Sequence, residues 1–169
     1  MEKRSFETII RALDKAGARY LIVGGVAVVA HGYVRFTVDL DVFLDLEPEN
    51  LKTALSVLSG LGYRPRAPVN IADFADPAIR RVWIEEKGMK VFSLSSSEHP
   101  STEIDIFSEA PFEFSAAHAQ AVRLEVCPGV AAAFVDLDRL IAMKKRAGRP
   151  KDLLDVDELN ALRKEPSGD

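Results

Sequence analysis

The sequence predicts a single α/β (α+β) domain, in which a mixed, twisted sheet is flanked by helices and closed on one side by two C-terminal helices. Segments with strand-like alternation are interleaved with segments whose apolar residues recur at the helical period, and this order is typical of such folds. A length of 169 residues suits one domain with its own core. We expect residues 1–135 to form this core and residues 136–165 to form a helical pair that packs on it.

The N-terminal part of the chain alternates between helix and strand signals. Apolar residues recur at the helical period up to Gly17, which is placed as a C-terminal cap. Pro48 occupies the first turn of a later helix, where a backbone amide has no partner inside the helix. We expect helices over residues 5–16, 25–31 and 48–59, and strands over residues 19–23 and 38–46.

Beyond residue 63, strand and turn signals dominate until the last two helices. Residues 64–80 contain three prolines, so we expect a long connection with at most one helical turn. Asp136 is suited to cap a helix, and Gly148 followed by Pro150 separates this helix from the last one. We expect strands over residues 81–85, 89–94, 102–107, 121–127 and 130–135, and helices over residues 111–119 and 137–147.

Two carboxylates, Asp39 and Asp41, lie one residue apart in the strand that follows the Gly24-Gly25 turn. Successive side chains of a strand point to opposite faces, so these two share a face, whereas in a helix they would lie about 200° apart. Glycine amides that open a helix can approach phosphate, and paired carboxylates can hold a divalent cation. Metal-assisted chemistry on a nucleoside triphosphate needs this combination. The alternative is an edge strand with one solvent-exposed acidic face.

A third acid, Asp105, lies in the apolar strand expected over residues 102–107, which can pair beside the first acidic strand. Mg²⁺ prefers oxygen ligands and is usually held by one or two carboxylates together with substrate phosphates. We therefore expect Asp39, Asp41 and Asp105 to bind Mg²⁺ or Mn²⁺, with a second metal ion that activates the attacking hydroxyl. Glu103 shares the face of Asp105 and is the second choice for this position.

Four polar side chains near these acids are candidate phosphate ligands. Arg35 and Thr37 share the face of the acids by strand alternation and can bind phosphate, although both are also ordinary surface residues of a strand. Lys144 interrupts the apolar stripe of its helix, so its ammonium group either reaches the triphosphate or lies at the rim of the core. Lys151 lies in the first turn of the last helix, where a cation is unfavourable unless an anion binds there.

Composition argues against several other classes of site. The net charge of −4 gives no sign of general nucleic-acid binding, although residues 144–151 are locally basic and form either a solvated helix end or a surface for an anion. Cys127 is the single cysteine, which excludes an internal disulfide and a cysteine-rich metal site. No apolar run approaches the roughly 18 residues of a membrane span, and we expect a cytoplasmic protein without membrane contact.

Together these residues resemble the minimal nucleotidyltransferase superfamily, which has the fold of DNA polymerase β. Its pattern is a Gly-Gly or Gly-Ser pair, then Asp-x-Asp or Asp-x-Glu, then a single Asp on a later strand, and the chain matches it with Gly24-Gly25, Asp39, Asp41 and Asp105. The second glycine stands where the superfamily often has serine. Within this superfamily the chain looks similar to the abortive-infection, AbiEii-like toxin nucleotidyltransferases, through Gly24-Gly25-x-Ala27, Arg35-x-Thr37-x-Asp39-x-Asp41 and Lys144…Arg149-x-Lys151-Asp152-x-x-Asp155.

The resemblance implies a metal-dependent enzyme that moves a nucleoside monophosphate from a nucleoside triphosphate, such as ATP, to an acceptor hydroxyl. It also implies that Asp39 and Asp41 hold the metal ions, that Asp105 is the base, and that Lys144 and residues 149–152 contact the nucleotide or assist catalysis. The acceptor would be an RNA 3′ end such as that of tRNA, a protein or a small molecule, and a toxin would have an antitoxin protein as partner. One alternative is a non-catalytic module that binds nucleotide or a protein partner. Another is metal-dependent hydrolysis of a phosphodiester, which uses similar carboxylates with water as the nucleophile.

Overall fold

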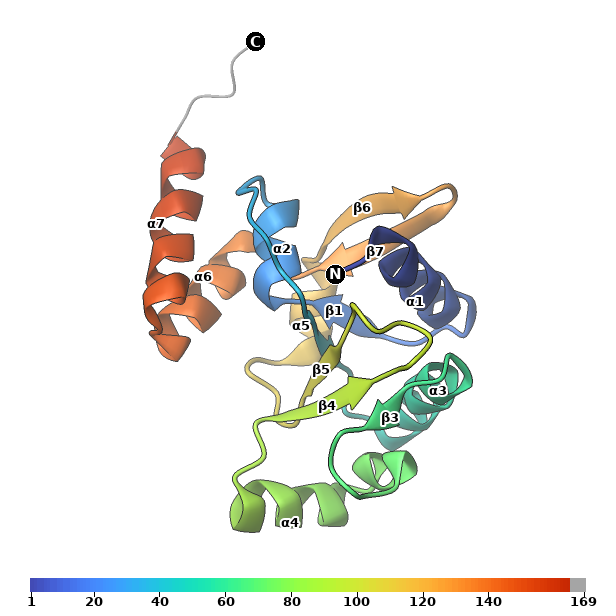
Figure 1. Ribbon diagram of the computed structural model, residues 1–169. Helices are drawn as coiled ribbons and strands as arrows, with labels where there is room; N and C mark the ends of the chain where they lie inside the picture. The colour runs from blue at the N-terminus through green and yellow to red at the C-terminus, as the bar shows by residue number, and fades with distance from the viewer. Residues whose placement is uncertain (165–169) are drawn as a thin grey trace.

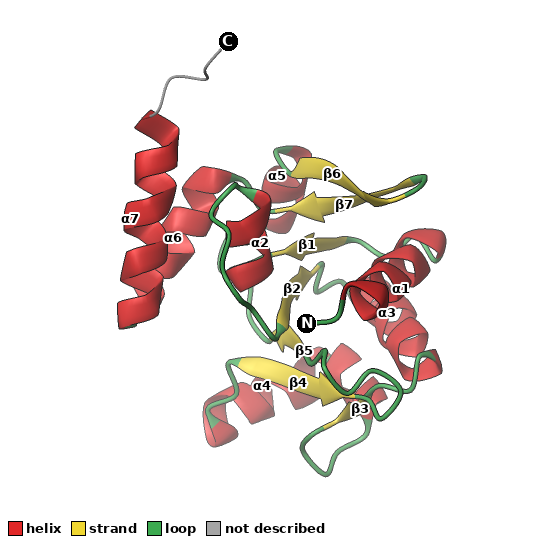
Figure 2. Cartoon of the chain, turned by 45° about the horizontal axis from the view of Figure 1, so that its top comes forward, coloured by secondary structure: helices red, strands yellow, loops and turns green. Residues whose placement is uncertain are grey.

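Strands and helices alternate along residues 1–164, which are the part of the chain that the computed structural model describes. They build a seven-stranded mixed sheet flanked by helices, which confirms the predicted fold class (Figures 1 and 2). The strands are β1 (Tyr20–Ile22), β2 (Leu40–Leu44), β3 (Arg64–Pro65), β4 (Val91–Ser95), β5 (Ile104–Phe107), β6 (Val122–Cys127) and β7 (Val130–Phe134). The helices are α1 (Lys3–Lys15), α2 (Gly24–Ala30), α3 (Pro48–Gly60), α4 (Pro77–Lys87), α5 (Phe114–Ala119), α6 (Leu137–Ala147) and α7 (Pro150–Lys164), with a 3₁₀ helix η1 (Ile71–Ala75).

The order of the strands across the sheet is β3-β4-β5-β2-β1-β7-β6. Two neighbouring pairs are parallel, β2 with β5 and β1 with β7, and the other pairs are antiparallel. Strand β2 lies in the middle of the sheet, and its Leu40, Phe43 and Leu44 are fully buried. This central position fixes β2 between two hydrogen-bonded neighbours, so residues at its start have a rigid support.

The helices lie on both sides of the central strands. Helices α1 and α3 lie on one side, while α2, α6 and α7 lie on the other (Figures 1 and 2). Helix α1 buries Ile9, Ile10 and Leu13, as its apolar spacing predicts. None of the helices in the described residues has the length and apolar character needed to cross a bilayer.

Cap residues determine where the two C-terminal helices begin and end. The Asp136 side chain accepts a hydrogen bond from the Arg139 amide at 3.0 Å and caps α6. Gly148 ends α6 with a left-handed φ of +65°, and α7 begins at Pro150. The division into a core and a helical pair over residues 136–165 stays a prediction, and residue 165 lies outside the described residues.

The strand predicted over residues 81–85 is wrong, because these residues belong to α4. The Asp76 side chain accepts hydrogen bonds from the Ala78 and Ile79 amides and caps this helix, Pro77 occupies its first turn, and Gly88 ends it with a φ of +63°. These three helix signals outweigh the strand preference of the valine, tryptophan and isoleucine between them. The predicted connection over residues 64–80 is also more structured than expected, since it contains β3, η1 and the start of α4.

Candidate active site

Two of the three predicted acids lie side by side in the middle of the sheet. Strands β2 and β5 pair in parallel with Asp41 opposite Asp105. Residues opposite one another in a sheet point to the same face, so the two carboxylates share one face. Their strand neighbours Leu40 and Ile104 point to the other face and are buried in the core. Strand pairing therefore brings together two acids that are far apart in the sequence.

The remaining predicted acid, Asp39, precedes β2 instead of lying inside it. The strand begins at Leu40, whose amide donates a hydrogen bond to the Glu103 carbonyl at 2.9 Å. Asp39 is exposed and lines the same pocket as Asp41. The side chain of Glu103, the second choice for the role of Asp105, forms an ion pair with Arg66 at 2.9 Å.

The Gly24-Gly25 turn lies directly against these acids and the segment before them. Gly24 has a φ of +64°, and a Cβ atom there would collide with the Asp41 carboxylate. The backbone amide of Gly25 also favours the ionised form of Asp41 and lowers the pKa of this carboxyl. A Cβ atom on Gly25 would lie 2.5 Å from Thr37 Oγ1 and 3.0 Å from Arg35 Nη2. Both positions therefore require glycine, the first for its backbone conformation and both for close contact.

The two adjacent carboxylates of Asp41 and Asp105 repel one another. Burial, together with the negative charges of Asp105 and Asp39, raises the pKa of Asp41 to about 6, although the Gly25 amide and Lys144 act in the opposite direction. The Ser93 hydroxyl, on the neighbouring strand β4, donates a hydrogen bond to Asp105 Oδ1 at 2.5 Å. A cation placed between the carboxylates would relieve their repulsion.

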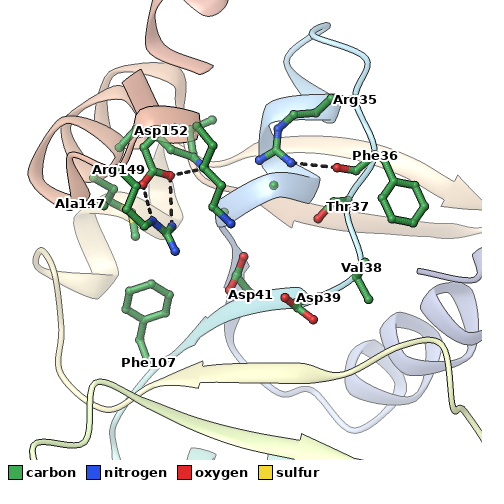
Figure 3. Close-up of a pocket in the computed structure, with 16 residues that line it drawn as sticks. Arg35, Phe36, Thr37, Val38, Asp39, Asp41, Phe107, Ala147, Arg149 and Asp152 are labelled. Carbon is green, nitrogen blue, oxygen red and sulfur yellow. Dashed lines mark hydrogen bonds and ion pairs between the residues drawn. The ribbon is translucent and has the colours of Figure 1, made fainter. Parts of the chain in front are cut away.

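A pocket of about 310 Å³ opens above the acids, between the segment before β2 and the corner of α6 and α7 (Figure 3). Figure 3 shows Asp39 and Asp41 between Arg35 and Thr37 on one side and Arg149 on the other. The polar residues that line it are Arg35, Thr37, Asp39, Asp41, Lys144, Arg149, Lys151 and Asp152, and the side chains of Phe36, Val38, Phe107, Leu140, Met143 and Ala147 add apolar surface. Asp105 does not line this pocket and lies beside it, next to Asp41.

Three of the pocket cations are held by two buried carboxylates of α7. Lys144 Nζ lies 3.2 Å from Asp152 Oδ1 and 2.8 Å from Asp155 Oδ2. Arg35 pairs with Asp155, and Arg149 pairs with Asp152. Lys144 is 6% exposed and also lines the pocket, and its contact with a triphosphate stays a prediction.

Sequence reasoning missed the ion-pair role of Asp152 and Asp155, although a signal was present. The buried residues of α7 are Asp152, Asp155, Val156 and Leu159, whose spacing is that of one helix face. Two acids in this stripe and Lys144 in the buried stripe of α6 have opposite charges, and such charges are buried together when they pair. Ser93 and Phe107 carried no comparable signal, because only strand pairing and tertiary contact place them at the site.

Comparison with known proteins identifies the fold. No protein-family model and no curated protein match the chain. The crystal structure of ANT(2″)-Ia in complex with adenylyl-2″-tobramycin matches 95% of this chain and 94% of its own, with a TM-score of 0.53 and 15% identity. The solution structure of the antibiotic-resistance factor ANT(2″)-Ia matches 95% of this chain and 88% of its own, with a TM-score of 0.57 and 15% identity. The chain has the nucleotidyltransferase fold. The narrower likeness to AbiEii-like toxins stays a prediction.

The oxygen ligands at the acidic end of this nucleotidyltransferase fold suit a hard divalent cation. Within residues 1–164, no group of three or more His, Cys, Asp or Glu side chains is arranged to hold a metal ion on its own. Mg²⁺ does not need such a group, because one or two carboxylates and the substrate phosphates complete its shell. Asp39 and Asp41 line the pocket together, and the raised pKa of Asp41 marks a place where positive charge is favoured.

Proposed function

We propose that this protein is a metal-dependent nucleotidyltransferase, which moves a nucleoside monophosphate from a nucleoside triphosphate to an acceptor hydroxyl. One observation carries the proposal. Asp41 and Asp105 lie in register on one face of the sheet, and Asp41 contacts the Gly24-Gly25 turn in a pocket lined by arginine and lysine. Such a pocket supplies both the carboxylates for a metal ion and the cations for a polyphosphate. The fold shared with ANT(2″)-Ia supports this choice.

Each residue of the site has a distinct role in this proposal. Asp39 and Asp41, with Asp105 beside them, hold Mg²⁺ or Mn²⁺, which supplies Lewis-acid stabilisation of the phosphate charge when bound. The absence of side chains at Gly24-Gly25 lets the triphosphate approach the backbone closely. The cations of the pocket bind the phosphate oxygens, and Thr37 donates a hydroxyl hydrogen bond. These cations are Arg35, Lys144, Arg149 and Lys151.

The transfer itself is an in-line displacement at the α-phosphorus. The acceptor oxygen forms a new bond to this phosphorus, and the bond from the α-phosphorus to the bridging oxygen of the β-phosphate breaks. Pyrophosphate leaves with the electron pair, and the proton of the acceptor hydroxyl passes to Asp105. Ser93 holds Oδ1 of that carboxylate, which leaves Oδ2 to accept the proton. The pocket cations stabilise the charge that develops on the phosphates.

The wider role follows the sequence resemblance. We propose a cytoplasmic, AbiEii-like enzyme that acts as the toxin of a toxin–antitoxin system, with an antitoxin protein as its partner. Three classes of acceptor enter the test: an RNA 3′ end such as that of tRNA, a protein side chain, and a small molecule. The adenylyl-2″-tobramycin bound to ANT(2″)-Ia favours including an aminoglycoside among the small molecules.

The test is label transfer from each of the four α-phosphate-labelled nucleoside triphosphates with Mg²⁺. Total tRNA, a cell lysate, tobramycin and a no-acceptor control are offered in parallel. We expect label on one class of acceptor with the unmodified protein, none with Asp39→Asn/Asp41→Asn, and full transfer with Asp157→Asn, a matched change at an exposed position of α7. Label that moves equally well in the double variant would contradict the assigned site.

The alternative, a non-catalytic binding module, makes a different prediction for Asp105→Asn. Loss of the base reduces transfer to a small residual rate while leaving binding of the Mg²⁺-nucleotide complex largely intact. If the unmodified protein binds Mg²⁺-nucleotide but moves no label to any acceptor, the binding module is the better description. If it binds none of the four nucleotides, the assigned site is wrong.

A further inference from the structure

Two buried carboxylates of α7 hold three cations that belong to three different parts of the chain. We propose that Asp152 and Asp155 are positioning residues, which set Arg35, Lys144 and Arg149 in place for the outer phosphates of the nucleotide. The proposal rests on the proposed function and adds a determinant of preference for triphosphate over monophosphate.

Burial shows that these carboxylates are paired rather than solvated. Asp152 and Asp155 are 0% and 1% exposed and lie on one face of α7. A buried carboxylate without a partner is strongly unfavourable, so such groups occur with cations or hydrogen-bond donors. Burial alone would raise the pKa of Asp152, but hydrogen bonds from Arg149 and Lys144 reverse this and lower it below its ordinary value. Asp152 is therefore ionised at neutral pH.

Asp155 connects the segment before β2 with α6. Arg35 Nε lies 2.7 Å from its Oδ1, and Arg35 Nη2 donates to its Oδ2 at 2.9 Å. Lys144 Nζ lies 2.8 Å from the same Oδ2. The guanidinium thus makes one hydrogen bond to Asp155, from Nη2, and a close ion pair through Nε, and together they hold it beside this carboxylate. Since Arg35 Nη2 also lies 3.0 Å from the place of a Cβ atom on Gly25, Asp155 holds this guanidinium over the glycine turn.

Asp152 completes the network from the other side of Lys144. Arg149 Nε and Nη2 lie 2.5 Å and 3.1 Å from Oδ2 and Oδ1 of Asp152, and Lys144 Nζ lies 3.2 Å from Oδ1. Lys144 thus bridges the two carboxylates and joins the three cations in one network of ion pairs. Figure 3 shows the contacts from Asp152, including the paired hydrogen bonds to Arg149.

The cations face the pocket, whereas Asp155 does not. Arg35, Lys144 and Arg149 all line the pocket, and Asp155 is absent from its lining. Asp155 therefore acts through the cations, behind the surface that a nucleotide would touch. Each cation keeps further donor groups for a ligand: a guanidinium has five N–H donors and an ammonium three, and the pairs described use only part of them.

Such a network lowers the entropic cost of binding a ligand, because the cations are already held in place. Lysine and arginine side chains lose much rotamer freedom on immobilisation, and prior fixation removes this cost from binding. Three cations against two carboxylates leave one net positive charge, which favours the ligand with more negative charge. A triphosphate reaches the cations with its β- and γ-phosphates, while a monophosphate lacks both groups. The network therefore contributes mainly to triphosphate binding.

The test compares Asp155→Asn with the unmodified protein by isothermal titration calorimetry in Mg²⁺. ATP, GTP, CTP and UTP, and the monophosphate of each, are titrated separately into the protein, and the two affinities are compared for each base. We expect Asp155→Asn to weaken triphosphate binding about tenfold, the effect of one charge-assisted hydrogen bond, with the monophosphate affinity changed much less. Asp155→Glu keeps the charge but moves the carboxylate, and we expect it to lose part of the preference. Asp157→Asn, an exposed change on the same helix, serves as the matched control.

The titrations separate the role of Asp155 from nucleotide binding itself. If the unmodified protein prefers triphosphates and the folded Asp155 variants keep that preference, the positioning role is overturned while the proposed function stands. A rise in triphosphate affinity would show that Asp155 competes with phosphate, which also overturns it. If neither variant folds, as judged by thermal unfolding, Asp155 serves the fold alone and the proposal fails. An unmodified protein that binds no nucleotide overturns both proposals.

Discussion

Gly25 and Thr37 approach one another so closely that a Cβ atom on Gly25 would lie 2.5 Å from Thr37 Oγ1. The contact joins the glycine turn to the segment that leads into Asp39. The superfamily pattern often has serine at the second position of the glycine pair, and here Thr37 occupies the space that a serine side chain would need. The Thr37 hydroxyl thus lies directly beside the glycine turn, in the space that a side chain at position 25 would need.

Gly25→Ser is expected to disturb the site through this contact. Its Cβ would displace Thr37 and Arg35, and overpacking of this kind costs about 1–3 kcal/mol of unfolding free energy. We expect a lower midpoint of urea unfolding and a higher KM for the triphosphate. The companion variant Gly25→Ser/Thr37→Ala removes the closest atom and should recover part of the stability.

Gly60→Ala is the control for this series, because nothing lies within 4 Å of a Cβ atom at that position. It lies at the end of α3, away from the pocket, and should leave stability and transfer unchanged or slightly improved. The steric explanation fails if Gly25→Ser unfolds at the same urea concentration as Gly60→Ala.

Gly24→Ala tests the contact with Asp41 separately from backbone strain. Gly24 and Gly17 have φ values of +64° and +69°, so alanine at either position costs about 1–2 kcal/mol of backbone strain. Only at Gly24 does the new Cβ collide with the Asp41 carboxylate, whereas nothing lies within 4 Å at Gly17. We expect both variants to be destabilised in thermal unfolding, and only Gly24→Ala to lose label transfer. Equal transfer by the two variants would argue against the role of this contact.

The sequence predicted most of the fold because the decisive signals are local. Apolar periodicity, proline in first turns and glycine after last turns located α1, α3, α6 and α7 to within a few residues. The failure at residues 81–85 came from weighing β-branched and aromatic residues above the helix caps at Asp76 and Gly88. The caps decide, because they satisfy amides and carbonyls that a helix end leaves free, whereas strand preference depends on neighbouring strands.

The site was predictable where it depends on spacing and hidden where it depends on packing. Asp39 and Asp41 follow from a two-residue spacing, and Asp105 from its place on an apolar strand, and the structure brings Asp41 and Asp105 into register. The partners of the pocket cations lie on a helix far along the chain, so no local pattern joins Arg35 to Asp155. Only the pairing of Lys144 with the acids of α7 was indicated, by opposite charges within the buried stripes of α6 and α7.

Asp41→Asn is expected to stabilise the metal-free protein while abolishing transfer. Burial and the charge of Asp105 raise the pKa of Asp41 from 3.8 to about 6, so the folded protein binds this proton more tightly than the unfolded chain. The stability that this proton contributes to folding is fully present below about pH 4, and it is lost as the pH rises through about 6. Asparagine does not ionise, so the variant should gain up to about 3 kcal/mol at pH 7 and little at pH 4.

Urea unfolding in EDTA at several values of pH between 4 and 7 measures this difference. The control is Asp157→Asn, which removes a carboxylate from an exposed position of α7 and should shift stability little at any pH. A gain for Asp41→Asn that is equal at pH 4 and pH 7 would show that the effect is not the titration of this carboxyl. Mg²⁺ added to the unmodified protein should reduce the gap, because it relieves the same repulsion.

Ser93→Ala is expected to slow transfer without weakening nucleotide binding. The Ser93 hydroxyl donates to Asp105 Oδ1 at 2.5 Å and fixes the carboxylate that accepts the acceptor's proton. Loss of one hydrogen bond to a charged group corresponds to a fall in kcat of about tenfold or more, and KM for the triphosphate should stay the same because Ser93 does not line the pocket. Ser95→Ala, the same change two residues along β4, is the control and should leave kcat unchanged.

In an Asp105→Asn background, Ser93→Ala should have no further effect on the residual rate, since the hydroxyl acts only through that carboxylate. A fall in rate that persists in this background would instead place Ser93 in a separate, structural role.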